Sequence, residues 1–381
     1  MKKLAIIGAN SVQNRLILKA KELGFETHVF AWECGDIGEK TADYFYPISI
    51  VQKDEILEKC REISPDGICT IASDLAAITV NYVAEKLGLC CNPTEITEQC
   101  TNKYEMRKCF FGHGIKTPAF IKTDKVCKET DNMKYPLIVK PTDRSGSRSI
   151  TKVYAKEELQ EAIMSAVNDS FEKQAIVEEY ISGDEYSCEC ISFDGKHTYL
   201  AITKKFTTGE PNFIETGHVQ PSGLSEDMEC RVKDYIFSAL DALGIRNGAS
   251  HSEFRIDENG EINIIEIGAR MGGDCIGSDL VFLSTGLDFV KMVIDVACSK
   301  APDLNKAGDK HRAEIRFIFN EDDIFELENI RKNTPEKIYF VSEIERSDKV
   351  SDSSTRWGYY IMAEKIPEEN YEGNQVKDCD R

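Results

Sequence analysis

Two glutamates, Glu253 and Glu266, have the spacing that most directly indicates chemistry in this sequence. They lie on two predicted strands that flank Asn259-Gly260, the strongest short signal for a two-residue hairpin turn. Pairing the strands outward from that turn places Glu253 directly opposite Glu266. Like charges in that position destabilise a sheet. A cation between them removes the conflict, and magnesium is the first candidate where a phosphate is near, because hard cations prefer oxygen ligands.

Two other readings of the hairpin stay open. A four-residue turn places His251 opposite Glu266, and an exposed sheet face leaves both glutamates solvated. The next residues favour a phosphate-handling site, because Arg270 and two glycines, Gly272 and Gly273, follow the second strand. An arginine and a flexible glycine loop at a strand end suit phosphate binding.

Composition excludes several classes of protein. The chain has 381 residues, which predicts two to four domains, and its 41% hydrophobic and 30% charged content is typical of soluble globular proteins. The apolar runs are shorter than the roughly 18 residues of a membrane span, and the first is too short for a signal peptide. The net charge of −19 argues against nucleic acid as the main partner. We therefore predict a cytoplasmic protein with neither a membrane nor a nucleic-acid partner.

Cysteine spacing adds to this expectation. The 14 cysteines are scattered irregularly and lack the paired spacing of a zinc site, so neither a disulfide framework nor a zinc centre is predicted. Most are expected to be small buried hydrophobic residues in a reducing compartment.

The first 98 residues alternate strands and helices, which predicts a small parallel α/β sheet. The loop that begins at Gly8, after the first strand, lacks the GxGxxG pattern that a dehydrogenase would carry. The expected strands cover 4–8, 26–32, 67–71 and a short stretch at Leu89, and the expected helices cover 13–23, 53–63 and 76–87.

Beyond residue 98, charged residues stand at the ends of apolar strands. The run 135–141 carries Lys140 near its end, and the run 174–180 carries Glu178 and Glu179. A lysine at the end of an apolar strand needs an acidic or phosphate partner, because burying its charge is costly. A polar loop containing Gly146 follows at 142–149. Later elements are a helix over 282–297 and strands near 313–319, 338–344 and 357–363.

Together and in this order, these segments resemble the ATP-grasp superfamily, and within it the carboxylate–amine ligase group. Carbamoyl-phosphate-synthetase-like and glycinamide-ribonucleotide-synthetase-like proteins are the apparent relatives, and the resemblance covers roughly residues 1–300. It implies an ATP-grasp fold of the α/β and α+β classes, with a central antiparallel sheet. The expected domains are an N-terminal parallel α/β domain over 1–98, an ATP-grasp domain over 99–300 with a small lid subdomain at about 112–180, and a C-terminal α+β segment over 301–381 that completes the substrate pocket.

The resemblance also implies a role for each matching residue. Lys103 and Lys140 would bind the phosphates of ATP, and Glu253 and Glu266 would bind magnesium or manganese. Arg270 would face the transferred phosphoryl group, so Arg270 and Lys140 are the expected catalytic residues. The remaining nucleotide-binding candidates are the lid loop residues Ser145, Gly146 and Ser147, the adenine-binding hinge of Glu178, Glu179, Tyr180 and Ile181, and Glu185 for the ribose hydroxyls.

One position departs from the pattern of the family. Many relatives have asparagine two residues after the second metal glutamate, where this chain has Gly268. The site is therefore expected to bind one or two metal ions.

The implied reaction joins a carboxylate to an amine, each part of an amino acid or a similar small metabolite. ATP would convert the carboxylate to an acyl phosphate, and the amine would then displace phosphate. Lys204 or Arg316 would bind a carboxylate, His218 would accept the amine proton, and Gly272 and Gly273 would line the substrate site. A homodimer is one expected assembly, since dimers are common in the group.

Two alternatives remain. One is a purine enzyme of the glycinamide-ribonucleotide-synthetase type, and the other is a non-catalytic nucleotide-binding regulatory module. The complete set of Lys140, Glu253, Glu266 and Arg270 argues against the second.

Overall fold

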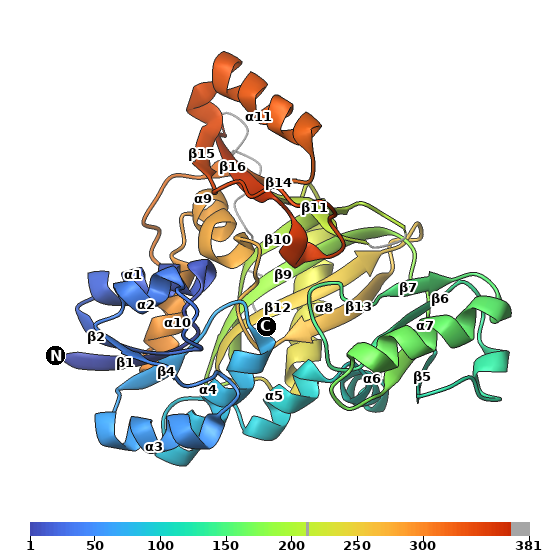
Figure 1. The fold of residues 1–381 in the computed structure, drawn as a ribbon, viewed down its shortest axis with the longest axis horizontal. Helices are drawn as coiled ribbons and strands as arrows, with labels where there is room; N and C mark the ends of the chain where they lie inside the picture. Colours follow the sequence, from blue (N-terminus) through green and yellow to red (C-terminus); the bar gives the residue numbers. More distant parts are fainter. Residues whose placement is uncertain (211–212, 367–381) are drawn as a thin grey trace.

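A computed structural model describes residues 1–210 and 213–366. Within these residues the strands form three sheets, shown in Figure 1 as an N-terminal blue unit, a green lid at the right and a long central sheet that ends in the red C-terminal strands. The mixture of one parallel and two antiparallel sheets confirms the predicted fold class. No helix in the described ranges is long and apolar enough to cross a membrane.

The N-terminal unit is the predicted parallel α/β sheet, with strand order β3-β2-β1-β4. Its central strand carries four fully buried apolar residues, 4–7, as expected for a parallel strand covered on both faces. Leu89 is not a strand residue, because its amide donates to the Ala84 carbonyl and belongs to the end of a helix. The elements are β1 (Lys2–Ile7), α1 (Ser11–Glu22), β2 (Phe25–Phe30), α2 (Ile37–Thr41), β3 (Tyr44–Tyr46), α3 (Lys53–Ile63), β4 (Gly67–Cys69) and α4 (Asp74–Leu87).

The lid is a four-stranded antiparallel sheet with the order β5-β8-β6-β7. One helix, α7, covers it and buries Leu159, Ala162, Ile163 and Ala166, the spacing of a single helical face. Two helices lead from the N-terminal unit into the lid, and the second is capped by Asn102, whose side chain accepts from two amides. The elements are α5 (Thr94–Thr101), α6 (Lys103–Gly112), β5 (Phe120–Thr123), β6 (Leu137–Pro141), β7 (Thr151–Val153), α7 (Lys156–Asp169) and β8 (Ala175–Glu179).

The central sheet is antiparallel, with the order β13-β12-β9-β10-β11-β14-β16-β15. Helix α8 packs its apolar face on it. The last three strands, β14, β16 and β15, come from the C-terminal segment and extend this sheet. The elements are β9 (Asp184–Phe193), β10 (Lys196–Thr207), β11 (Glu215–Gln220), α8 (Glu226–Leu243), β12 (Gly248–Ile256), β13 (Ile262–Gly268), β14 (His311–Ile318), α11 (Glu321–Asn333), β15 (Ile338–Val341) and β16 (Gly358–Lys365).

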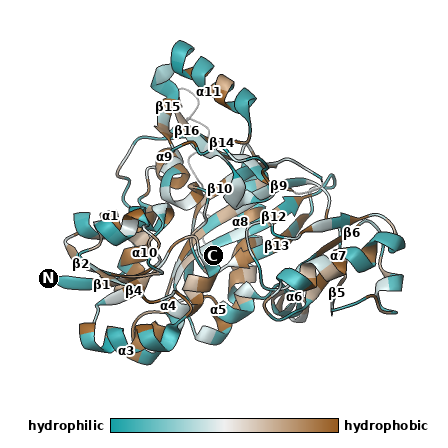
Figure 2. Cartoon of the chain, viewed as in Figure 1, coloured by the Kyte–Doolittle hydropathy of each residue, from teal (hydrophilic) through white to brown (hydrophobic). Residues whose placement is uncertain are grey.

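The single helix predicted over 282–297 is wrong. A π-helical turn (Ile276–Leu280) leads into α9 (Val281–Thr285), and a break separates this from α10 (Phe289–Ala297). Gly286 causes the break, because its φ of 78° ends the helix and a Cβ there would lie 2.3 Å from the Gly308 carbonyl oxygen. Helix α10 is strongly apolar in Figure 2, whereas α11 is mostly hydrophilic. One hydrophobic core includes α10 together with residues of the N-terminal and central sheets, so these two units are firmly joined.

Candidate active site

A cavity with an empty volume of about 1130 Å³ lies between the lid and the central sheet, and it brings together most of the predicted residues. All thirteen residues predicted for nucleotide, metal and catalysis line it: Lys103, Lys140, Ser145, Gly146, Ser147, Glu178, Glu179, Tyr180, Ile181, Glu185, Glu253, Glu266 and Arg270. The five substrate candidates Lys204, His218, Gly272, Gly273 and Arg316 do not line it.

The opposed glutamates are present, although the predicted turn is not. Glu253 pairs with Glu266, and His251 pairs with Gly268, which excludes the alternative register. The turn holds three residues between Asp257 and Glu261, whose backbone groups pair at 3.1 Å. This shifts the pairing next to the turn by one position, and a β-bulge between Glu253 and Phe254 restores the register. The two-residue turn was therefore wrong, and the bulge explains why the predicted carboxylate pair still forms.

Each glutamate of this pair contacts a buried lysine. Lys103 Nζ lies 3.1 Å from Glu266 Oε2, and Lys205 Nζ binds Glu253. Glu185 and Glu215 also approach Lys205, at 3.5 and 3.9 Å. Burial lowers the pKa of Lys205, but the three carboxylates outweigh burial and raise that pKa above its ordinary value. Lys205 therefore carries a positive charge inside an acidic cluster.

Lys205, and not the predicted Lys204, contacts the carboxylate of Glu253. Neighbouring residues on a strand point to opposite faces, so only one of the two lysines can face Glu253. Lys204 instead forms a partly exposed pair with Asp184 at 2.9 Å. The sequence Lys204-Lys205 gave no signal for which of the two faces inward, since the face depends on the register with β9.

The lid end of the cavity holds one carboxylate between two cations. Glu178 Oε2 lies 2.7 Å from Lys140 Nζ, and Glu178 Oε1 accepts from Arg107, which sequence reasoning missed. All three side chains are buried. Burial would raise the pKa of Glu178, but Arg107 and Lys140 lower it to about 2. The predicted partner of Lys140 is therefore an acid, and the cluster keeps a net positive charge.

Fewer backbone amides of the predicted adenine-binding hinge are available than expected. The amides of Glu179 and Tyr180 donate to the carbonyls of Ala119 and Pro136, both at 3.0 Å, so neither is free to bind a nucleobase. The Ile181 carbonyl accepts from Arg255 at 2.8 Å, and the same guanidinium binds Glu185 at 2.8 Å. Arg255 thus fixes the distance between the hinge and the predicted ribose carboxylate.

The polar loop of the lid follows β6 and lies against the first predicted lysine. Lys103 Nζ donates to the Arg144 carbonyl at 2.6 Å, and the Lys103 amide donates to the Thr142 carbonyl at 2.8 Å. Gly146 and Ser147 both have positive φ, 76° and 56°. Such turns direct successive amides toward one point, which suits an anion.

A bidentate ion pair orients Arg270. Its Nε and Nη2 donate to the two carboxylate oxygens of Asp74 at 2.8 and 3.0 Å, so the N-terminal unit contributes a residue to the site. Burial would lower the pKa of Arg270, but Asp74 raises it above its ordinary value. A Cβ at Gly268 would lie 3.0 Å from Asp74 Oδ1 and 3.2 Å from Arg270 Cζ. A side chain at this position would therefore be crowded by the Asp74–Arg270 pair.

His218 and Arg316, two of the predicted substrate residues, lie in different surroundings. His218 is buried 3.6 Å from Asp274, and both ring nitrogens lack a hydrogen-bond partner among the described residues. Burial lowers the pKa of His218, as expected for a neutral ring. Arg316 pairs with Glu314 and Glu326 away from the cavity, so its predicted role is not supported.

Gly272 and Gly273 form a supporting loop behind the cavity. The Gly272 amide donates to Glu189 at 3.0 Å, and a Cβ there would lie 2.7 Å from His251 Nδ1. Close packing against His251 therefore explains why a glycine occupies position 272.

The C-terminal segment supplies a residue that the sequence did not indicate. Arg356 donates to both oxygens of Asp274, at 2.7 and 3.0 Å, and its guanidinium carbon lies 3.6 Å from the centre of the Phe317 ring. It also reaches the Glu215 carbonyl at 3.4 Å. Arg356 does not line the cavity, so the role of the C-terminal segment in completing the substrate pocket stays a prediction.

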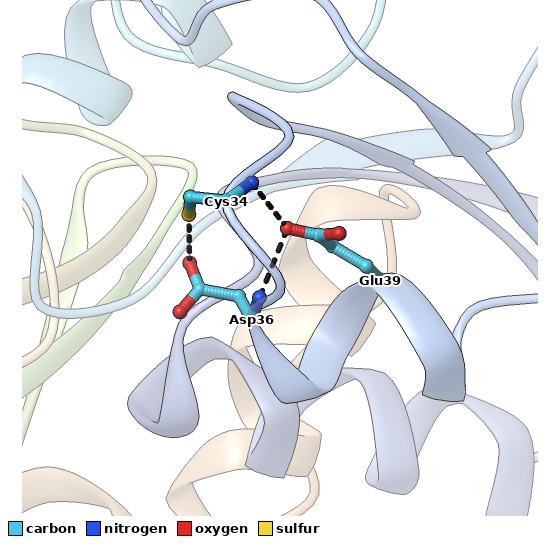
Figure 3. A group of neighbouring side chains, drawn as sticks. All are labelled: Cys34, Asp36 and Glu39. Carbon is cyan, nitrogen blue, oxygen red and sulfur yellow. Dashed lines mark hydrogen bonds between the residues drawn. The ribbon is translucent and has the colours of Figure 1, made fainter.

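A cluster of Cys34, Asp36 and Glu39 at the start of α2 has the composition of a metal site, and Figure 3 shows its contacts. Glu39 accepts from the amides of Cys34 and Asp36 at 2.9 Å, and the Cys34 thiol donates to Asp36. These bonds form a capping box at the helix start. The cluster is a helix cap and carries no further assignment.

Comparison with known proteins decides the family. A family model described as the ATP-grasp domain matches residues 133–279. Alanine–anticapsin ligase of Bacillus subtilis is 30% identical over 314 residues, which cover 71% of this chain and 65% of that relative. The chain therefore contains an ATP-grasp domain. The match spans slightly less than two thirds of the length of the relative.

Solved structures agree with this ATP-grasp assignment at the level of the fold. The L-amino acid ligase from Bacillus licheniformis superimposes with a TM-score of 0.81 at 24% identity, covering 97% of this chain and 95% of that one. Phosphoribosylglycinamide synthetase from Anaerococcus prevotii superimposes with a TM-score of 0.75 at 22% identity, covering 98% and 96%. Both matches extend over the N-terminal unit, the lid and the central sheet.

Proposed function

We propose that this protein is an ATP- and magnesium-dependent ligase that joins a carboxylate to an amine and releases ADP and phosphate. The observation that carries the proposal is the cavity between lid and central sheet. It places cations at one end, around Lys140, and the opposed carboxylates of Glu253 and Glu266 at the other. A nucleoside triphosphate with its metal ion has a distribution of charge complementary to that of the cavity.

Glu253 and Glu266 would hold the magnesium ion. The residues fit, because hard carboxylate oxygens are the ligands that magnesium prefers, and the two strands place them opposite each other. When bound, the ion would neutralise charge on the phosphate oxygens. Gly268 offers no third side-chain ligand, and the Asp74–Arg270 pair fills the space beside it. We therefore favour one tightly held metal ion, and a second would depend on other ligands.

The chemistry needs no protein nucleophile. An oxygen of the substrate carboxylate attacks the γ-phosphorus of ATP, the bond to the β-phosphate oxygen breaks, and ADP leaves with the electron pair. The amine nitrogen then attacks the acyl carbon, phosphate departs and the amine loses a proton. Lys103, Lys140 and Arg270 would oppose the charge that develops on the phosphoryl oxygens. The lid loop would exclude water from the acyl phosphate.

Amino acids are the substrates that the relatives favour. Two of the matched proteins are alanine–anticapsin ligase and L-amino acid ligase. The likeness to phosphoribosylglycinamide synthetase keeps a purine-type activity as the second candidate. The homodimer stays a prediction.

ADP release by the purified protein tests the proposal. The protein is incubated with Mg·ATP and amino acids, singly and in pairs, and products are identified by mass. Stimulation by one pair together with a dipeptide mass is the expected result. Turnover only with glycine and a phosphorylated ribosylamine would favour the purine-type enzyme. Failure of every carboxylate to stimulate ADP release would favour the nucleotide-binding regulatory module.

A further inference from the structure

A second, smaller cavity adjoins the first on the far side of the lid loop. The two share Arg144, Ser145, Arg148 and Glu266 in their walls. Asp74 and Leu75 at the start of α4 close the opposite side. Glu266, a predicted metal ligand, is thus a wall of both cavities, so a molecule in the second would lie beside the transferred phosphoryl group.

The lid side of this second cavity presents two arginines together with the carboxylate of Asp143, which accepts from two backbone amides. Burial would raise the pKa of Asp352, but the charge of Arg148 is among the causes that lower it. Within the ranges 1–210 and 213–366, the side chains of Arg144 and Arg148 form neither a salt bridge nor a hydrogen bond, and Arg144 Nε is buried without a partner. The Arg144 guanidinium carbon lies 4.4 Å from the centre of the Phe171 ring, which holds the group over the cavity wall. The chain carries a net charge of −19, so unpaired arginines that line a cavity indicate an anionic ligand.

The opposite side has the reverse charge. Asp74 and Glu266 place carboxylates there, and Leu75 adds an apolar side chain to the lining. Asp74 already binds Arg270, which fixes its position. A ligand that fits this arrangement carries a carboxylate for the arginines and an ammonium or amine toward the opposite side. A free α-amino acid has both groups.

We propose that the second cavity binds the acceptor amino acid, with Arg144 and Arg148 holding its α-carboxylate and its amino group directed toward the wall that the two cavities share. This inference rests on the proposed ligase function and deepens it, because it makes the acceptor a free amino acid. The donor carboxylate and ATP occupy the first cavity. The amine then faces the acyl phosphate from across Glu266.

The test compares an acceptor amino acid with its carboxamide, which keeps the amine and loses the negative charge. The quantity measured is the ratio of kcat/KM for the two acceptors, in the wild type and in the Arg144→Gln and Arg148→Gln variants. We expect the wild type to prefer the acid by about tenfold to a hundredfold, the effect of a charge-assisted bidentate contact. In each variant the ratio should fall toward one, because the carboxylate has lost its partner. Since the ratio is taken within one protein, a general loss of activity does not affect it.

Arg331→Gln is the matched control, because Arg331 pairs with Glu328 on the surface of α11, and it should keep the wild-type ratio. Unchanged ratios in both cavity variants would overturn the inference. So would a rise in the KM for ATP with the acceptor ratio intact, which would assign the arginines to the nucleotide phosphates. Hydroxylamine separates the two claims, since it traps an acyl phosphate without needing an acceptor site. Wild-type protein that forms no hydroxamate with any carboxylate would overturn the proposed function and this inference together.

Discussion

The two ends of the cavity balance charge in opposite ways. At the lid end one carboxylate, Glu178, lies between two cations, Arg107 and Lys140. At the hairpin end one ammonium, Lys205, lies among the carboxylates of Glu253, Glu185 and Glu215. The first cluster carries an excess of positive charge and the second an excess of negative charge.

The difference suits the proposed binding of both phosphates and a metal ion in one cavity. Glu178 and Lys205 each lower the free-energy cost of burying the opposite charges around them. Each cluster still has an excess of one sign of charge, which attracts a ligand of the opposite sign. The positive excess suits phosphate oxygens, and the negative excess suits a divalent cation. A ligand that carries both charges would bind across the whole cavity.

Breaking the lid cluster should have the largest effect. Glu178→Gln leaves Lys140 and Arg107 buried without a counterion, and losing one partner of a buried ion pair costs about 3–5 kcal/mol. We expect a loss of that size in the free energy of unfolding, measured by urea denaturation at pH 7. A loss below about 1 kcal/mol would contradict the charge balance inferred for this end.

The same cluster predicts a dependence on pH. Its two cations hold the pKa of Glu178 at about 2, below the ordinary 4.5. The contribution of the carboxylate to stability is thus complete above about pH 4.5 and is lost as the pH falls toward 2. Between these values the wild type should lose more stability than Glu178→Gln does, and parallel curves would exclude the assignment.

At the hairpin end, Glu266→Gln should reduce turnover on the order of 10²–10³-fold, as expected for the loss of one preorganised charge in an active site. The fold should remain intact, because the Glu266 side chain is 19% exposed and its ion-pair partner is Lys103. Steady-state kinetics and circular dichroism measure the two effects. Glu261→Gln, in the turn of the same hairpin, is the control and should match the wild type.

Lys205→Met sharpens the comparison, because it removes the cation from the acidic cluster. We expect a loss of about 1–3 kcal/mol in the free energy of unfolding, the cost of buried charges left without their partner. Magnesium with a non-hydrolysable ATP analogue should recover more of this loss than it recovers in Glu178→Gln, since the ion adds positive charge at the hairpin end. Equal recovery in both variants would remove the distinction between the ends.

The neighbouring lysine gives the smallest effect. Lys204→Met should change stability by no more than about 0.5 kcal/mol and leave turnover unchanged, because its pair with Asp184 is partly exposed. Thermal unfolding and ADP release are measured for this variant and for Lys205→Met under the same conditions. A loss of activity equal to that of Lys205→Met would place Lys204 in the site after all.

Many of the proposed nucleotide-binding residues could be named because they stand at strand ends and turns, and the family resemblance then gave them their roles. Lys140 ends an apolar strand, Glu178 ends another, and Glu253 and Glu266 flank a turn signal. The predicted pairing of Glu253 with Glu266 is correct although the predicted turn is wrong. The longer turn shifts the register by one residue, and the β-bulge shifts it back.

The residues that were missed act through contacts distant in sequence. Asp74 reaches Arg270 across 196 positions, and Arg107 reaches Glu178 across 71. Arg356 likewise meets Asp274 only once the C-terminal strands join the central sheet. A single strand or helix carries no mark of such pairs, and the inward face of Lys205 depends on the register of a neighbouring strand. Local motifs and the family resemblance therefore indicate the proposed nucleotide residues, whereas the contacts around them follow only from the assembled sheet.

Transfer of oxygen isotope tests the central claim most directly. The amino acid that stimulates ADP release as donor is prepared with ¹⁸O in its carboxylate, and the phosphate released with the coupled product is analysed by mass. An acyl phosphate leaves one carboxylate oxygen on the phosphate, so we predict a single ¹⁸O in each phosphate formed. Phosphate free of ¹⁸O, formed while the amide product accumulates, would contradict the account.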